Sequence, residues 1–197
     1  MPFRIEEKIS ITKENLFLFY NFLLKNKALN LYPSRNINSI YFDNDLFKMF
    51  YDSEEGVVPR KKIRTRNYNN LTDYLLEKKI SSSEGRFKVS EKVNDPKNFY
   101  KFGLFDDIYG ICKPRLRVSY QRSYFKVLDF RVTIDTNIKF QKFSIYNKFF
   151  ENSISDEVVV EIKSNNILDY NSLQNKFPFT KIRFSKYSKG IASIYGY

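Results

Sequence analysis

Three copies of the pattern Glu-x-Lys stand out among the residues that could do chemistry, and they begin at Glu6, Glu77 and Glu161. Each copy places a carboxylate and an ammonium group on one side of an extended chain, because alternate residues of a strand share a face. Hard divalent cations such as Mg²⁺ and Mn²⁺ take one or two carboxylates and fill their other positions with phosphate or water. The pattern therefore favours a site in which a divalent cation and an anionic ligand are bound together.

A second group of chemically useful residues is the pair Arg64 and Arg66, which alternate within a predicted strand, residues 61–68. Planar guanidinium groups bind two phosphate oxygens at once, and Lys side chains add mobile positive charges. Phosphoryl transfer asks a protein mainly for positioning and charge neutralisation. The absence of His from the sequence is therefore no obstacle to this chemistry.

The elements that must position these residues are mostly strands. One amphipathic helix is predicted from Thr12 to about Leu29, and the tail 188–197 is expected to form a short helix or strand. Period-two alternation predicts eight strands: residues 3–11, 39–43, 61–68, 74–80, 86–90, 115–122, 130–135 and 157–163. We expect a mainly antiparallel α+β protein, and closure of the sheet into a barrel would remove its exposed edges.

The predicted strands have one apolar face and one face that carries mainly Arg and Lys. In residues 157–163, for example, Val158 and Val160 oppose Glu161 and Lys163. If the apolar face packs outward against helices, the charged face lines a water-filled tunnel. Such a lining predicts a polyanionic ligand.

One predicted strand, residues 115–122, does not fit this arrangement. Arg122 shares its parity with Leu116 and Val118, so a regular strand with its apolar residues outward would point Arg122 outward as well. Either a bulge reverses the facing, or Arg115 and Arg117 line the tunnel instead.

Composition restricts the class of protein. The 197 residues favour a single domain over residues 1–197, and 34 Lys+Arg against 22 Asp+Glu give a net charge of +12 that points to an anionic partner. Without His and with a single Cys, the chain cannot form a Ser-His-Asp triad or an internal disulfide. Cys112, in a predicted loop, is expected to be an inert thiol. The absence of a leader or membrane-spanning segment predicts a cytoplasmic protein.

The motifs that carry the charged residues occur in a specific order. They are RIEEK (4–8), SIYFD (39–43), RKKIRTRNY (60–68), LLEKK (75–79), SYQRSYF (119–125), FRVTID (130–135), VVVEIK (158–163) and FSKY (184–187). In this order they resemble the VTC polyphosphate polymerase domain, a branch of the triphosphate tunnel metalloenzymes or CYTH-like superfamily. The resemblance implies a closed eight-stranded tunnel barrel with flanking helices, a bound triphosphate or phosphate chain, and Mn²⁺ or Mg²⁺.

The resemblance also implies roles for individual residues. The expected phosphate-binding and catalytic residues are Lys8, Arg64, Arg66, Lys79, Arg122, Arg131, Lys186 and the hydroxyl of Ser185. Strand alternation adds Arg86, Lys88 and Lys163 to the positions that should face the substrate. Glu161 is the expected main metal ligand. Glu6 and Glu77 are candidates for holding metal, a water molecule or neighbouring Lys residues.

The expected activity is that of an ATP-dependent polyphosphate polymerase, a metal-dependent phosphotransferase. A terminal phosphate is already ionised near neutral pH and could attack the γ-phosphorus of ATP directly, whereas hydrolysis would have to activate water. Alternatives are a triphosphatase on the same scaffold, a non-catalytic polyphosphate or inositol-phosphate binder, and a single-stranded nucleic-acid binder, the last disfavoured because aromatic and charged residues take opposite faces. A membrane partner protein that receives the product is compatible with the sequence.

Overall fold

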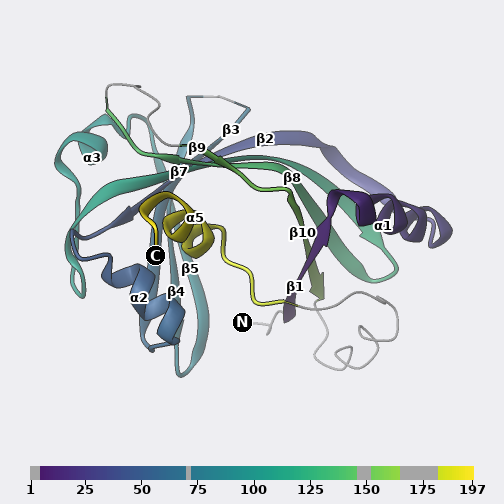
Figure 1. Cartoon of the computed structure of the whole chain (residues 1–197), viewed down its shortest axis with the longest axis horizontal. Coiled ribbons are helices and arrows are strands. Elements are labelled where there is room, and N and C mark those ends of the chain that lie inside the picture. Colours follow the sequence, from purple (N-terminus) through teal and green to yellow (C-terminus); the bar gives the residue numbers. More distant parts are fainter. Residues whose placement is uncertain (1–4, 70–71, 146–151, 165–181) are drawn as a thin grey trace. The chain divides into compact units, whose positions relative to one another are not determined.

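The computed structural model describes residues 5–69, 72–145, 152–164 and 182–197 (Figure 1). These residues form an α+β protein of mostly antiparallel strands. The elements in chain order are β1 (Ile5–Thr12), α1 (Lys13–Lys25), β2 (Leu29–Asp43), α2 (Lys48–Glu55), β3 (Arg60–Tyr68), β4 (Tyr74–Ser82), β5 (Gly85–Val93), α3 (Lys97–Phe102), β6 (Leu104–Asp106), β7 (Gly110–Val127), β8 (Phe130–Lys142), β9 (Asn152–Ile154), β10 (Glu157–Ser164) and α5 (Lys186–Tyr195).

All eight predicted strands are present, and most are longer than the alternation predicts. The prediction missed the short helices α2 and α3 and the three-residue strands β6 and β9. Helix α1 ends at Lys25 rather than near Leu29, because Asn26 caps it and Lys27 adopts a positive φ of 52°. The tail is a helix, α5. None of the helices in the described part of the chain is long and apolar enough to cross a membrane.

The strand order corrects the expectation of a closed barrel. Hydrogen-bonded neighbours follow the order β1-β10-β8-β7-β2-β3-β4-β5, with β6 on β7 and β9 on β8. Within the described residues no pairing joins β1 to β5, so the sheet is open. The exposed edge strand β5 carries Arg86, Lys88 and Lys92, and charged side chains protect such an edge from pairing with another chain.

The chain divides into two compact units, each assembled from segments that are distant in sequence. The first unit contains Met1–Arg35, Tyr120–Ile138 and Ser155–Phe184, and the second contains Asn36–Ser119, Lys139–Ile154 and Ser185–Tyr197. Strands β2, β7 and β8 contribute residues to both.

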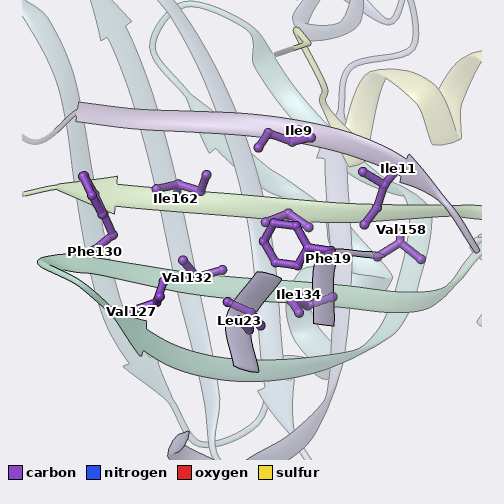
Figure 2. Packing of buried hydrophobic residues seen from close by; sticks show 11 residues of the cluster. Ile9, Ile11, Phe19, Leu23, Val127, Phe130, Val132, Ile134, Val158 and Ile162 are labelled. Atoms are coloured by element: carbon purple, nitrogen blue, oxygen red, sulfur yellow. The ribbon is translucent and has the colours of Figure 1, made fainter. Parts of the chain in front are cut away.

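In the first unit, β10 lies between β1 and β8, and both pairings are antiparallel. Figure 2 shows apolar side chains of these three strands gathered around Phe19 and Leu23, the two buried residues of α1. The buried cluster comprises Ile9, Ile11, Phe19, Leu23, Val127, Phe130, Val132, Ile134, Val158, Val160 and Ile162. The alternating residues of the same strands therefore present their charged side chains on the opposite face.

Helix α1 begins where the sequence predicts it. The hydroxyl of Thr12 accepts a hydrogen bond from the backbone N–H of Asn15 at 3.3 Å, which satisfies one of the free donors of the first turn. Glu14 in the first turn and Lys25 in the last turn match the helix dipole. Phe19 and Leu23, four residues apart, lie on one side of the helix and enter the core.

In the second unit, β2, β3, β4 and β5 form an antiparallel meander. Its apolar face packs against α3, where the ring of Tyr100 stacks on that of Phe42 with centroids 6.2 Å apart. Ile63 of β3 is fully buried on this side. Arg64 and Arg66 alternate with it and project from the other face.

Helix α5 also belongs to the second unit and sits very close to its strands. A methyl group at Gly190 would lie 2.6 Å from Leu116 Cδ2 and 2.7 Å from Phe140 Cδ1, so only glycine permits this approach. Cys112 lies in β7 rather than in a loop, and its burial raises the pKa of the thiol to about 12. An inert thiol fits this environment, because the reactive thiolate is suppressed.

Candidate functional site

The candidate residues gather in two groups of charged side chains, one in each unit. The Glu161 cluster, in the first unit, contains Lys8, Arg122, Arg131, Thr133, Asp135, Glu161 and Lys163. The Glu77 cluster, in the second unit, contains Ser39, Tyr41, Arg64, Arg66, Glu77 and Lys88.

Glu161 is a buried carboxylate surrounded by positive charge. Its side chain is 10% exposed, its Oε1 lies 2.7 Å from Lys163 Nζ, and its Oε2 lies 3.9 Å from Arg122 Nη2. Burial works against the charged form, but Lys163, Arg122 and Lys8 outweigh it and hold the pKa of Glu161 well below its usual value. The carboxylate is therefore ionised at neutral pH.

Arg122 joins this cluster through Asp135. Its Nε donates to Asp135 Oδ1 at 2.5 Å and its Nη2 to Asp135 Oδ2 at 2.7 Å, a bidentate pair that fixes the guanidinium plane. The strand prediction treated Arg122 as an exception because Leu116 has the same parity. Leu116 is buried against α5 in the second unit. The parity that Arg122 shares with Leu116 therefore does not require Arg122 to point away from the charged cluster. Arg115 contacts Asp45 and the carbonyl oxygen of Asp43.

The neighbouring positions complete the Glu161 cluster. Lys8 lies opposite Glu161 in register and donates to the carbonyl oxygen of Phe184 at 2.9 Å. Arg131 is exposed and lies over the ring of Tyr124 at 5.9 Å. Glu6 lies opposite Lys163 in the register of β1 and β10, and its side chain is outside the described part of the structure.

Asp135→Asn should destabilise the protein by about 3 kcal/mol, because it leaves the largely buried guanidinium of Arg122 with a neutral partner. Asp129→Asn, at an exposed position of the same unit, is the control and should change the free energy of unfolding by less than about 0.5 kcal/mol. Urea denaturation measures both values. Equal stability of the two variants would contradict a structural role for the Asp135 carboxylate.

Glu77 occupies the centre of the second cluster and is fully buried. Its Oε2 accepts from Arg64 Nε at 2.6 Å and lies 3.7 Å from Arg66 Nη1, while its Oε1 lies 2.5 Å from Lys88 Nζ. Burial disfavours the charged form, but these three cations hold the pKa of Glu77 at about 2. Of the roles left open for Glu77, the contact with Lys88 favours the one in which it holds a neighbouring lysine, and Arg64 and Arg66 are partners that the sequence did not predict.

Two polar side chains of β2 position the arginines. Arg64 Nη1 donates to the hydroxyl of Tyr41 at 2.7 Å, and Arg66 Nε donates to the hydroxyl of Ser39 at 3.1 Å. Both partners follow from the register, in which Tyr41 lies opposite Arg64 and Ser39 opposite Arg66. Neither residue was among the predicted site residues, although alternation with Ile40 and Phe42 places both on the charged face.

A row of lysines crosses the same face of the meander. Lys62, Lys79 and Lys88 are register partners on β3, β4 and β5. Lys79 and Arg86 are exposed, and the side chain of Lys88 is 50% exposed. These positions offer solvent-accessible positive charge beside the buried arginines.

The start of α5 brings the FSKY motif to this face. Ser185 caps the helix by accepting from Ser188 N at 3.2 Å, and its hydroxyl also receives a hydrogen bond from Lys62 Nζ at 2.9 Å. Lys186 is half-buried and contributes to lowering the pKa of Tyr41, together with Arg64 and Arg66 and against the effect of burial. Ser185 and Lys186 are therefore part of the same cationic face in the second unit.

The Glu161 cluster fits a divalent cation better than the Glu77 cluster does. No group of three or more His, Cys, Asp or Glu side chains close enough to hold a metal occurs in the described ranges, so any site relies on few carboxylates. Such a site suits Mg²⁺, which keeps waters and phosphate oxygens as ligands. Thr133 on β8 is the register partner of Glu161 on β10. The buried Oγ1 of Thr133 has no hydrogen-bond partner among the described residues. The ionised carboxylate of Glu161 is a suitable start for such a site.

Comparison with known proteins identifies the family. A family model described as the VTC domain matches residues 3–195. The chain belongs to the VTC domain family. No curated protein sequence gives a significant match. The VTC domain assignment confirms the resemblance found in the sequence motifs.

Several solved structures share the fold of this VTC domain. An adenylate cyclase candidate from Bacillus halodurans matches with a TM-score of 0.62 and 11% identity over 93% of this chain and 94% of that chain. One from Vibrio parahaemolyticus matches with a TM-score of 0.56 and 12% identity over 97% and 98%. An adenylyl cyclase candidate from Hippeastrum, described as having a dominant triphosphatase activity, matches with a TM-score of 0.57 and 14% identity over 96% of both chains. The TM-scores and the shares of the chains that are covered show a common fold.

Proposed function

We propose that this VTC domain is an ATP-dependent polyphosphate polymerase that transfers the γ-phosphate of ATP to a growing phosphate chain. The observation that carries the proposal is the Glu161 cluster, in which an ionised, buried carboxylate lies among Lys8, Arg122 and Lys163. This combination suits a divalent cation and a phosphate group at the same place. Mn²⁺ or Mg²⁺ held by Glu161 would supply charge stabilisation to the transferred phosphoryl group.

The residues of the chain would bind and orient the anionic groups. Asp135 fixes Arg122 so that its guanidinium lies in a defined plane. Lys8 on β1 and Arg131 on β8, the two neighbours of β10, add positive charge. In the second unit, Arg64 and Arg66 provide two further preoriented guanidinium groups. A phosphate chain carries many equivalent anionic groups, and either cluster offers cations that can bind them. Phosphate binding at each cluster can therefore be measured separately.

The protonation states favour a phosphate nucleophile over water. A general base works best with a pKa near the operating pH. The pKa of Glu161 is held well below its usual value and that of Glu77 at about 2, so neither carboxylate is a good proton acceptor at neutral pH. An ionised terminal phosphate needs no base, which supports transfer to polyphosphate.

A triphosphatase is the second candidate. The triphosphatase activity stated for the Hippeastrum protein of similar fold favours it. Hydrolysis would use the same cation and arginines with water as the acceptor.

Incubation of the purified protein with ATP and Mn²⁺ or Mg²⁺, followed by separation of the products by size, distinguishes the two reactions. We expect a ladder of phosphate chains together with ADP. Free phosphate without a ladder would overturn the polymerase proposal in favour of the hydrolase, and unchanged ATP would contradict both. Addition of EDTA is the control, since removal of the metal should stop either reaction.

A further inference from the structure

The hydroxyl of Thr133 is a buried polar group that the contacts described above leave unexplained. Thr133 is 4% exposed, and its Oγ1 finds no hydrogen-bond partner in the described residues. Buried hydroxyl groups nearly always have a partner, because burial without one costs free energy. The Oγ1 atom is therefore available to a group that the described residues do not supply.

The position of Thr133 in the sheet identifies the site that it faces. On β8 it alternates with the core residues Val132 and Ile134, so its side chain lies on the charged face. It is the direct cross-strand partner of Glu161, and directly opposite residues have Cβ atoms about 5 Å apart. Arg131 and Asp135, two residues away on the same strand, flank it on that face.

The charges around Thr133 favour an anionic ligand. Lys8, Arg122, Arg131 and Lys163 outnumber the carboxylates of Asp135 and Glu161 in this cluster. Both carboxylates already meet cationic groups, since Asp135 is paired with Arg122 and Glu161 with Lys163. The excess positive charge attracts an anion to the same face, where a hydroxyl group can donate to one of its oxygens.

We infer that Thr133 is a ligand-positioning residue whose hydroxyl donates a hydrogen bond to a phosphoryl oxygen of the ligand at the Glu161 cluster. This inference rests on the proposed function and adds a neutral donor to its cationic residues. Because the hydrogen bond of Oγ1 forms only with ligand, the buried hydroxyl destabilises the free protein and stabilises the complex.

The substitution Thr133→Val tests this assignment, since valine replaces the hydroxyl with a methyl group of similar size. Without ligand, the variant should melt at the same temperature as the wild type or higher. With tripolyphosphate in EDTA-containing buffer, its affinity measured by calorimetry should fall roughly tenfold to hundredfold, and the ligand-induced rise in melting temperature should shrink. Thr133→Ser, which keeps the hydroxyl, should retain most of the affinity.

Thr65→Val is the matched control. Thr65 is also a buried strand threonine, but its hydroxyl is bonded to that of Tyr100 at 2.8 Å, so its loss should lower the melting temperature. Thr133→Val that binds tripolyphosphate as tightly as the wild type, or that is destabilised as much as Thr65→Val, would overturn the inference. Wild-type protein that fails to bind tripolyphosphate would overturn both the inference and the proposed function. Binding without conversion of ATP would contradict only the function.

Discussion

Glu161→Gln should lower the turnover of ATP at least about 100-fold while binding of tripolyphosphate in EDTA remains equal or becomes tighter. Glutamine keeps the shape of the side chain and removes its charge, so the cation loses its anionic ligand. The same change removes the negative charge beside Lys163 and near Arg122, whose pairing with Asp135 remains, and it increases the attraction of the cluster for an anion. Steady-state kinetics and calorimetry measure the two effects.

The opposite directions of these two effects separate a metal ligand from a structural residue. A folding defect would weaken turnover and anion binding together. Glu157→Gln, on the same strand, is the control and should leave turnover within about twofold of the wild type. Unchanged turnover of Glu161→Gln would remove Glu161 from the proposed metal site.

Glu77→Gln should lower the free energy of unfolding by roughly 3 kcal/mol at pH 7, the value that corresponds to a pKa of about 2 in the folded protein against 4.5. The loss should depend on pH in a defined direction. Because the folded pKa is lowered, the stabilisation is complete above pH 4.5 and disappears as the pH falls toward 2. Urea denaturation of wild type and variant across this range measures the difference.

A ligand should partly repair this variant. Glu77→Gln leaves Arg64 and Arg66 buried without their counter-ion, and added tripolyphosphate can neutralise them. The melting temperature of the variant should therefore rise more with tripolyphosphate than that of the wild type. Glu91→Gln, at an exposed position of β5, is the control and should show neither the loss nor the larger rise. A pH-independent difference between Glu77→Gln and wild type would show that the carboxylate charge is not responsible.

The sequence predicted the strands and their two faces because alternation with period two is a strong local signal. The burial of Ile9, Val132 and Val160 beneath α1 follows directly from it. Closure of the sheet was a wrong prediction, since whether edge strands pair depends on long-range geometry that the local pattern does not contain. The short helix α2 was missed because its apolar residues are too few to show a period.

The candidate residues were also predicted in part. Alternation placed Arg64, Arg66 and Glu161 on the charged face, but their partners depend on strand register, which the sequence does not specify. Tyr41 therefore went unrecognised beside Arg64. Thr133 was visible in the motif FRVTID, and only the structure reveals that its hydroxyl has no partner among the described residues.

The contact between Asp43 and Tyr187 has a consequence for how this protein can diverge. The hydroxyl of Tyr187 donates to Asp43, whose carboxylate also accepts from the backbone N–H groups of Met49 and Phe50 at the start of α2. Replacing either side chain alone leaves a buried polar group without its hydrogen-bond partner. The SIYFD and FSKY motifs, 140 residues apart, should consequently be inherited as a pair, with homologues that have changed one showing a compensating change in the other.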